Sequence, residues 1–405
     1  MAARENYGKL LAFLCTRTRD VASAEDALSC AFEAALRDWP VKGVPALPQA
    51  WLVTVARREL VDNWRRHSVR EAASADLLLL ADVSSEDLDD NQRATPDDRL
   101  TLMFACAHPS IDQAVRAPLM LQTILGLDAA TIASAFLVAP ATMGQRLSRA
   151  KAKIKRAGIP FRLPEPEALP ERLDSVLDAV YTAFTQGWSD PAGLDARRQH
   201  LAEEGLWLGR LLATLMPDQA EVSGLLALML HAHARRAARR SATGDYIPLA
   251  QQDPALWDQP MIEMAESLLR DACKLQPIGR FQLEAAVQSA HASRRKTGRA
   301  DWRAIAALYQ ALATLTGSPV VAINRALAVA QLDGAAAGLA LLGAVADDPR
   351  LLAYQPYWAA RAHLLAACCH PEADAAYAQA IGLEIDPAVR RFLQSRRAAL
   401  GQNKK

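Results

Sequence analysis

The sequence predicts an all-α fold, because alanine and leucine dominate its composition and runs of β-branched residues are scarce. A third observation is that most segments show apolar periodicity of the helical type. The chain has 405 residues, of which 51% are hydrophobic and 22% charged, so it is long enough for two or three domains that each bury a core. We therefore expect a soluble helical protein with more than one domain.

Three helices are expected between residue 5 and about residue 70, in YGKLLAFLC, SAEDALSCAFEAALRDW and PQAWLVTVARRELVDNWRRH. Ser23 is the expected start of the second helix, which would place Glu25 and Asp26 in the first turn, where acids favour the helix dipole. Pro48 suits the first turn of the third helix. Between these two helices, PVKGVPALP predicts an ordered loop from Pro40 to Pro48.

The rest of the chain divides at an acidic stretch and at a proline-rich stretch. Residues 71–98 carry nine Asp or Glu against one Arg, which is typical of a solvated linker. A second helical block is expected over residues 97–157, and GIPFRLPEPEALP, with four prolines, indicates a domain boundary after it. From residue 171 onward, short loops such as TGSP and LDG between helices predict stacked helical hairpins.

The segment PATMGQRLSRAKAKIKRAG, residues 140–158, holds six Lys or Arg and no acid, in a chain whose net charge is +1. On a helix, its apolar residues gather in one stripe within about 60°. That stripe consists of Met143, Leu147, Ala150 and Ile154; opposite it lie Gln145, Ser148, Arg149 and Arg156, with Arg146 and Lys151 on the flanks. A solvated charged face would have this composition, but so would a helix that reads the DNA major groove, with side chains toward base edges and cations toward phosphates.

The preceding segment, GLDAATIASAFLV, favours the DNA-reading interpretation. Asp128 suits a helix N-cap, and the spacing of Ile132, Ala133 and Phe136 is that of an inward face. VAP then provides a short turn before the basic helix, so the order is helix, turn, helix, as in helix-turn-helix proteins. Leu137 stands where such turns often carry glycine.

These segments resemble a known family, the extracytoplasmic-function sigma factors of bacterial RNA polymerase. ASAEDALSCAFEAALRDWP followed by PQAWLVTVARRELVDNWRRHSVRE looks like their region 2, and GLDAATIASAFLVAPATMGQRLSRAKAKIKRAGIPF looks like their region 4. QQDPALWD, DWRAIAALY and SPVVAINRALAVA resemble the long helical extension of one subgroup. The resemblance implies region 2 in residues 1–70, a linker in 71–96, region 4 in 97–163 and a helical regulatory domain in 171–405.

The resemblance also implies two partners, core RNA polymerase and promoter DNA. In the family, the second helix of region 2 docks on the clamp helices of the polymerase, and the matching positions are Glu25, Asp26, Ser29 and Glu33. Acids that face a basic coiled coil are reasonable electrostatics. Helix capping would also account for these acids, and the two interpretations are compatible.

The resemblance implies that the loop after the second helix, together with the third helix, contacts the promoter where its strands open. In the family this loop captures an unstacked base of the minus-10 element; here a rigid loop at residues 40–48 would lower the ordering cost, and Lys42 would meet a phosphate. A plain connector is the alternative. Beside the melted strand, the resemblance implies a basic edge formed by Asn63, Trp64, Arg65, Arg66 and Arg70. Trp64 is open to a stacking or a core role, whereas Trp51 is expected in the core.

Region 4 of the family reads the minus-35 element with its recognition helix. The matching positions are Thr142, Gly144, Gln145, Arg146, Ser148, Arg149 and Lys151, of which Arg146 and Lys151 would hold phosphates. Gly144 stands where many relatives carry a larger polar or basic residue, so the preferred base sequence stays open. A contact from Arg149 to guanine is the main base contact that we expect.

The extension is expected to be regulatory: it would hold or release the DNA-binding regions, or stabilise polymerase engagement, and its helical hairpins offer grooves for a protein or peptide partner. Its last helix pair resembles a tetratricopeptide unit, because Ala373, Tyr377, Ala380 and Pro387 lie near the small, aromatic, small and proline positions. Polar and aromatic residues near its helix ends are interpreted as structural. These are Asp253, Trp257, Asp258, Asp301, Trp302, Asn324 and Arg325. In the assembled polymerase, the acidic linker would follow the path of the nucleic acid and RNA.

Two other functions remain open on the sequence. A DNA-binding activator with a helical-repeat sensor would share the helix-turn-helix and would not need region 2. An enzyme would use His231, His233 and His291 as acid or base groups, but no nucleophile or phosphate-binding loop accompanies them in the sequence. The segments CAHP and CCH hold histidine and cysteine, but neither is paired with a second metal-binding element. We expect no catalysis, metal or cofactor. Without a signal-peptide pattern or an apolar run of about 18 residues, a cytoplasmic protein that does not enter the membrane is expected.

Overall fold

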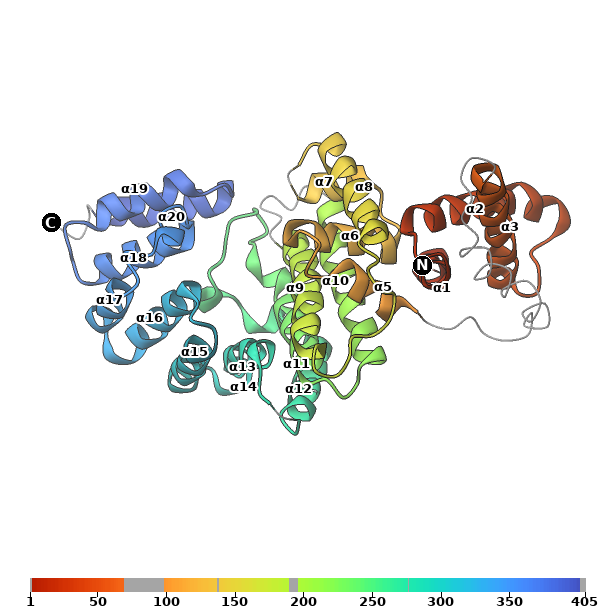
Figure 1. Cartoon of the computed structure of the whole chain (residues 1–405). Helices are drawn as coiled ribbons and strands as arrows, with labels where there is room; N and C mark the ends of the chain where they lie inside the picture. Colours follow the sequence, from red (N-terminus) through yellow and green to blue (C-terminus); the bar gives the residue numbers. More distant parts are fainter. Residues whose placement is uncertain (1, 69–97, 137, 189–195, 276, 401–405) are drawn as a thin grey trace. The chain divides into compact units, whose positions relative to one another are not determined.

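The structure is a computed structural model that describes residues 2–68, 98–136, 138–188, 196–275 and 277–400. These residues form helices and no strand, with one isolated β-bridge between Arg240 and Tyr246, so the predicted all-α class is confirmed. The chain divides into two compact units, Met1–Gly187 and Trp188–Lys405. We refer to them as unit 1 and unit 2 and describe each by itself (Figure 1).

Unit 1 is a helical bundle in which the first helix contacts four others. Its helices are α1 (Ala2–Thr18), α2 (Val21–Lys42), α3 (Pro48–Ser68), α5 (Arg99–Cys106), α6 (Gln113–Leu125), α7 (Ala129–Ala135), α8 (Pro140–Arg156) and α9 (Leu169–Trp188). α1 packs against α2, α3, α5 and α6. Gly8 permits a close approach there, because a Cβ at this position would overlap the backbone carbonyl oxygen of Ile124 on α6. The helices expected in regions 2 and 4 therefore share one core, and the predicted domain bounds stay a prediction.

The start of α2 differs from the predicted one. The helix begins at Val21 with Asp20 as its N-cap, and the Asp20 carboxylate accepts hydrogen bonds from the amides of Ala22 (3.1 Å) and Ser23 (3.3 Å). Ser23 was expected to cap the helix but lies inside it, because extended backbone at Asp20 lets the carboxylate reach these amides. Glu25 consequently lies in the second turn, beyond the first-turn position that was predicted.

The end of α2 also differs from the prediction. Pro40 lies inside the helix, which continues to Lys42, so the connection to α3 is shorter than the expected loop. Gly43 ends the helix with φ at 84°, a conformation that favours glycine, and its amide donates to the Trp39 carbonyl at 2.9 Å. Pro48 begins α3 as predicted.

The helix α9 belongs to unit 1, although residues from 171 onward were assigned to the extension. Arg172 donates a hydrogen bond to the Phe104 carbonyl on α5 at 2.8 Å, and Arg116 on α6 donates to Ser175 at 3.3 Å. Val180 and Phe184 on α9 are buried. The proline-rich stretch before α9 therefore does not mark the point where unit 1 ends.

Unit 2 continues with helices that pack on their neighbours along the chain (Figure 1). The α-helices are α10 (Ala196–Leu215), α11 (Ala220–Ala234), α12 (Gln259–Ala272), α13 (Arg280–Ala292), α14 (Arg294–Thr297), α15 (Trp302–Thr316), α16 (Pro319–Asp333), α17 (Ala335–Gly343), α18 (Gln355–Ala367), α19 (Ala373–Leu383) and α20 (Pro387–Ala399). Short 3₁₀ turns are η2 (Arg236–Arg239), η3 (Leu249–Gln251), η4 (Pro254–Leu256) and η5 (Pro349–Leu351).

The last helices of unit 2 pack as expected of stacked hairpins. α16, α17 and α18 share one apolar cluster around Tyr357, and α18, α19 and α20 share another around Tyr377. Ala373, Tyr377 and Ala380 are buried between the helices, and Pro387 begins α20.

Three of the polar residues that were interpreted as structural cap helices. Asp253, Asp258 and Asp301 each accept a backbone amide at the start of η4, α12 and α15, at 2.9 to 3.0 Å. Trp257 is buried in a cluster with Ile262 and Ala292. Their side chains therefore stabilise the helix starts and the core.

Candidate nucleic-acid interface

The helices α7 and α8 follow each other after a short connection, which is the order expected of a helix-turn-helix; that assignment stays a prediction. Asp128 caps α7, because its carboxylate accepts the Thr131 amide and hydroxyl, each at 2.8 Å. The Val138 amide donates to the Ala133 carbonyl at 3.0 Å and closes the turn. Pro140 begins α8, where a missing N–H leaves no hydrogen bond unmade. Leu137, which stands where glycine is common, lies outside the described residues.

The side chains of α8 divide into a buried stripe and an open polar face. Each residue of the predicted stripe, from Met143 to Ile154, is at most 8% exposed, which confirms that prediction. Five side chains expected to face DNA are exposed: Thr142, Gln145, Arg146, Ser148 and Arg149. A Cβ added at Gly144 would meet no atom within 4 Å, so this position leaves an open gap in the polar face.

Lys151 is the exception among the residues expected to face DNA. Its side chain is 11% exposed, and its ammonium bonds to the carboxylate of Glu25 on α2. One helical turn later, the Lys155 ammonium bonds to the Asp20 carboxylate at 2.7 Å. We call these two ion pairs the α2–α8 clasp. Asp20 and Lys155 were not among the predicted site residues, because they lie 135 residues apart and the sequence carries no signal for their pairing.

The two acids of the clasp are held differently. Asp20 also accepts the Ser23 hydroxyl at 2.7 Å. Burial raises the pKa of Asp20, but hydrogen bonds from Lys155 and Ser23 outweigh it, so this pKa lies below its ordinary value. For Glu25, burial outweighs the attraction of Lys151 and raises the pKa of its carboxyl. The second oxygen of Glu25, Oε1, is buried without a hydrogen-bond partner.

The other residues expected to contact the polymerase lie on the surface of α2. Asp26, Ser29 and Glu33 are exposed, and Glu25 is the half-buried member of this group. The structure therefore places three of the four side chains where a partner can reach them, and the fourth in the clasp.

The end of α2 and the following loop expose several apolar side chains. Leu36 (78% exposed), Val41 (84%), Val44 (65%) and Leu47 (50%) lie within twelve residues of chain. Lys42, the residue expected to meet a phosphate, forms a surface ion pair with Asp38 at 3.0 Å. Exposed apolar side chains in one short segment are typical of a contact surface.

The tryptophan predicted for the core packs against another tryptophan. The rings of Trp51 and Trp39 lie 5.5 Å apart at 59°, and both side chains are half-buried. Of the basic edge on α3, Arg65 is exposed and lies 3.9 Å from Asp62, while Asn63 is half-buried. The side chains of Trp64 and Arg66, and the whole of Arg70, lie outside the described residues.

Of the three histidines that an enzyme would use, His231 is buried in unit 2, whereas His233 and His291 are half-buried. His231 is 1% exposed and its Nε2 lies 3.4 Å from a carboxylate oxygen of Glu266. Burial, with a smaller effect of Arg235, lowers the pKa of His231 to about 4. Burial also lowers the pKa of His291 to about 4, and its ring packs edge-on against Trp302. Both imidazoles are therefore neutral at pH 7, and their pKa values lie below the range of an efficient general acid or base at that pH.

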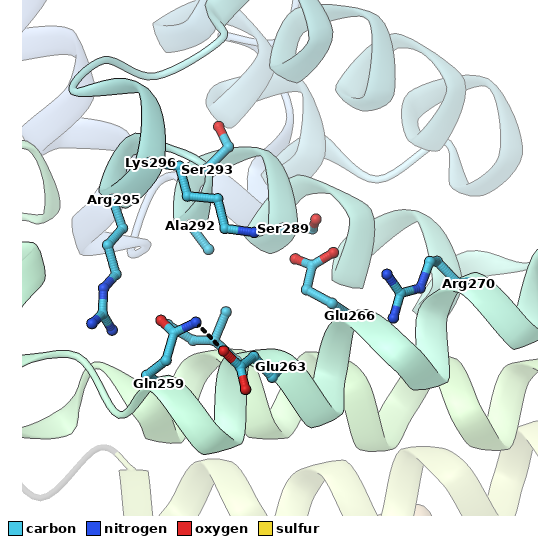
Figure 2. Close-up of a pocket in the computed structure, with 10 residues that line it drawn as sticks. Gln259, Glu263, Glu266, Arg270, Ser289, Ala292, Ser293, Arg295 and Lys296 are labelled. Carbon is cyan, nitrogen blue, oxygen red and sulfur yellow. Dashed lines mark hydrogen bonds between the residues drawn. The ribbon is translucent and has the colours of Figure 1, made fainter.

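A pocket of about 240 Å³ lies between α12, α13 and α14 (Figure 2). Gln259 donates to Glu263 at 2.6 Å across one turn of α12. Figure 2 shows Glu263 and Glu266 on α12 opposite Ser289 and Lys296. The pocket is thus lined by both acidic and basic side chains, and neither sign of charge dominates its wall.

The two groupings of histidine and cysteine, CAHP and CCH, at which no metal was expected, are built into turns. The His108 Nδ1 accepts the Ser110 amide at 3.1 Å, and the His370 Nδ1 accepts the Glu372 amide at 3.3 Å. Cys106 is buried, with its Sγ 3.4 Å from the Thr123 hydroxyl. In the part of the chain that the structure describes, no group of three or more His, Cys, Asp or Glu could hold a metal ion. None of the described helices is long and apolar enough to cross a membrane.

Different parts of the chain match different protein families. Residues 2–70 match the family model for sigma-70 region 2, and residues 172–273 match a family of unknown function, DUF6596. An uncharacterized protein of Rhizobium meliloti (strain 1021) is 38% identical over 373 residues, which cover 90% of this chain and 87% of that protein. No solved structure matches the chain.

Proposed function

We infer that this chain is a sigma factor. Its N-terminal region 2 places it in the sigma-70 family, and over nearly its full length it belongs to one family with the Rhizobium meliloti protein. It binds core RNA polymerase and directs promoter-specific initiation of transcription. The observation that carries this inference is that the region 2 match spans α1 to α3, and that two consecutive helices, α7 and α8, follow in the same unit, the second with an open basic face. Region 2 supports the sigma-factor role, and α7 and α8 support a second contact with the promoter.

We propose that the exposed acids of α2 contact the polymerase. Asp26, Ser29 and Glu33 project from the same helix and are exposed. Carboxylates on a rigid helix favour association with a basic partner, mostly through the rate of encounter. Replacing acids at this surface would therefore slow holoenzyme formation, more so at low ionic strength.

The minus-10 contact is assigned to the segment from α2 to α3. The exposed apolar side chains between Leu36 and Leu47 offer a surface on which an unstacked base loses contact with water. The conformation of Gly43 fixes the direction in which this segment leaves α2. Arg65 lies on the exposed side of the following helix, where it supplies a cation for the DNA backbone.

The minus-35 contact is assigned to the polar face of α8. Gln145, Ser148 and Arg149 carry the donors and acceptors that read base edges, and Arg146 holds a phosphate from the flank. The open space at Gly144 admits a water molecule or a base edge, so this position contributes little base discrimination by itself. Arg149 accounts for the largest part of the base discrimination.

We propose that unit 2 regulates unit 1 by binding a protein or a peptide. Between α18, α19 and α20 lies a groove of about 650 Å³ that includes Ile381 and Leu400, with Asp374 and Arg397 paired at 2.6 and 2.8 Å. Grooves between helical hairpins bind extended segments of partner proteins. Comparing the full chain with a chain that ends at Trp188, which keeps α9 with unit 1, tests this role. Equal transcription by both would refute it.

The experiment that tests the sigma-factor function is transcription in vitro with core RNA polymerase and the purified full chain. The template is a library with randomised upstream sequence, and the start sites of the transcripts are sequenced. We expect start sites that depend on the chain and share upstream sequence blocks. An activator would produce such transcripts only when another sigma factor is added, and that result would refute the proposal.

A further inference from the structure

A turn after α11 joins the early part of unit 2 to its last helix. The Arg240 guanidinium bonds to the carboxylate of Asp386, which caps α20, although the two residues are 146 positions apart in the chain. The ring of Tyr246 packs edge-on against Phe392 of α20, with 5.6 Å between the ring centroids. Figure 1 shows the segment after α11 running toward α19 and α20. Early and late segments of unit 2 therefore meet at this turn.

Arg235, at the C-terminal end of α11, lies close to this meeting point. Its Nη2 donates to Oε1 of Gln288 on α13 at 2.6 Å, and its Nε donates to the His231 carbonyl at 3.4 Å. Tyr246 of the turn and Tyr309 of α15 both interact electrostatically with Arg235. Arg235 and the two tyrosines are half-buried. Four segments of unit 2 thus contribute polar side chains to one place.

The guanidinium of Arg235 bonds to no carboxylate in the part of the chain that the structure describes. Burial lowers the pKa of Arg235 to about 10, and the charges of Arg239 and Arg294 lower it further. The group is still a cation at pH 7. A half-buried cation that no anion compensates costs free energy, because it has lost water without gaining an ion partner. An anion from outside the chain would recover this cost.

Two neighbouring arginines differ from Arg235, because the fold uses their donors. Arg294 donates three hydrogen bonds of 2.5 to 3.0 Å to backbone carbonyls in residues 249–252. Arg240 is paired with Asp386. Arg235 uses only Nε and one N–H of Nη2 within the described residues. Its Nη1 and the second N–H of Nη2 are left to bind two oxygens of one anion.

The two tyrosines supply further hydrogen-bond donors. No residue that the structure describes bonds to the hydroxyl of Tyr246 or of Tyr309. Burial raises the pKa of both, to about 12 for Tyr309, so both hydroxyls keep their proton at pH 7. A protonated phenol donates to an anion and does not repel it.

The acids of this region are bonded to other groups. The Glu284 carboxylate accepts a hydrogen bond from Arg280 at 2.7 Å, and Asp386 is paired with Arg240. Glu384 accepts the amide of Asp386 at 2.8 Å. None of these three acids bonds to the guanidinium at the end of α11.

We propose that Arg235, Tyr246 and Tyr309 bind the oxyanion of a small molecule, which is a phosphate or a carboxylate group. The guanidinium holds two oxygens side by side, and the phenol hydroxyls donate to the same group. Gln288 holds the guanidinium in its orientation. Because the donors come from α11, α15 and the turn that contacts α20, a bound anion stabilises the folded state of unit 2. This site goes beyond the proposed function and does not depend on it.

The test is calorimetric titration of the full chain with inorganic phosphate and, separately, with acetate, at an ionic strength kept constant with sodium chloride. We expect saturable binding of one anion per chain. Arg235→Gln removes the cation and should weaken binding by about tenfold or more, because hydrogen bonds from charged donors are the strong ones. Tyr309→Phe removes one neutral donor and keeps the ring, so it should weaken binding about fivefold.

The matched control is Arg270→Gln, which removes an exposed arginine from the pocket in Figure 2, a second place where an anion could bind. We expect this variant to bind as the unmodified chain does. Tighter binding of phosphate identifies a phosphorylated ligand and tighter binding of acetate a carboxylate, and either result supports the site.

Two results would overturn the proposal. One is that neither anion binds saturably, and the other is that Arg235→Gln binds as tightly as the unmodified chain. If Arg235→Gln does not fold, Tyr246→Phe and Tyr309→Phe decide in the same way, since both keep their rings. Unchanged affinity in both of these variants would then refute the site.

Discussion

Substituting Gly8 by alanine tests the close packing of α1 on α6. Alanine in place of glycine inside a helix normally stabilises by about 1 kcal/mol. At Gly8 the added Cβ would overlap the carbonyl oxygen of Ile124, which is backbone and cannot rotate away. Overpacking typically costs about 1 to 3 kcal/mol, so we expect a cost near the upper value and a net destabilisation of about 2 kcal/mol. For a unit of this size, Tm would fall by about 4 to 8 °C.

The matched control is Gly144→Ala on α8, where the added Cβ meets no atom within 4 Å. Here the helical gain is not opposed, so Tm would rise by about 2 to 4 °C. Thermal unfolding followed by circular dichroism measures both, and hydrogen exchange of the α6 amides assigns the transition to unit 1. If the two variants shift Tm in the same direction, the close approach of α1 to α6 is not present in the molecule.

Two further predictions concern DNA reading and pH. Arg149→Ala should reduce discrimination between promoter sequences by about 1 to 3 kcal/mol, or roughly 5- to 150-fold, with little change in total DNA binding. Selection from a promoter library measures this discrimination. Unchanged promoter choice would show that the reading face is assigned wrongly. The pKa of His231 is about 4 in the folded chain against 6.5 for an ordinary histidine, so the unfolded state binds the extra proton between these values. The stability of unit 2 should therefore be fully present above pH 6.5 and fall as the pH approaches 4, by about 2 kcal/mol from this residue between pH 7.5 and pH 5. Urea unfolding at both pH values should show a smaller pH dependence for His231→Leu than for the unmodified chain; an equal dependence would contradict the assignment of a buried neutral imidazole.

The features that sequence predicts well are those set by neighbours along the chain. The stripe from Met143 to Ile154 depends only on helical periodicity, and each member is buried. Asp128 caps α7 because the acceptor and the Thr131 amide lie three residues apart. The start of α2 was missed by three residues, because Asp20 and Ser23 are both suitable capping residues and only the backbone conformation decides between them.

The features that sequence does not predict depend on contacts far apart in the chain. Nothing local to Lys151 distinguishes a lysine that awaits a phosphate from one that is bonded to Glu25. The four prolines before α9 predict a domain boundary, which stays a prediction; the contact of Arg172 with α5 is one that no local pattern indicates. Pro40 did not end α2, since a proline near the end of a helix removes only one backbone hydrogen bond.

The central claim is that α2 to α3 and α8 read two elements of one promoter in a complex with core polymerase. Sequencing of the upstream DNA of all transcripts that the full chain initiates from a randomised library measures this directly. The account predicts two enriched sequence blocks at a fixed spacing, and loss of the distal block alone when Arg149 and Gln145 are both replaced by alanine. A single enriched block, or loss of both blocks together in that variant, would contradict it.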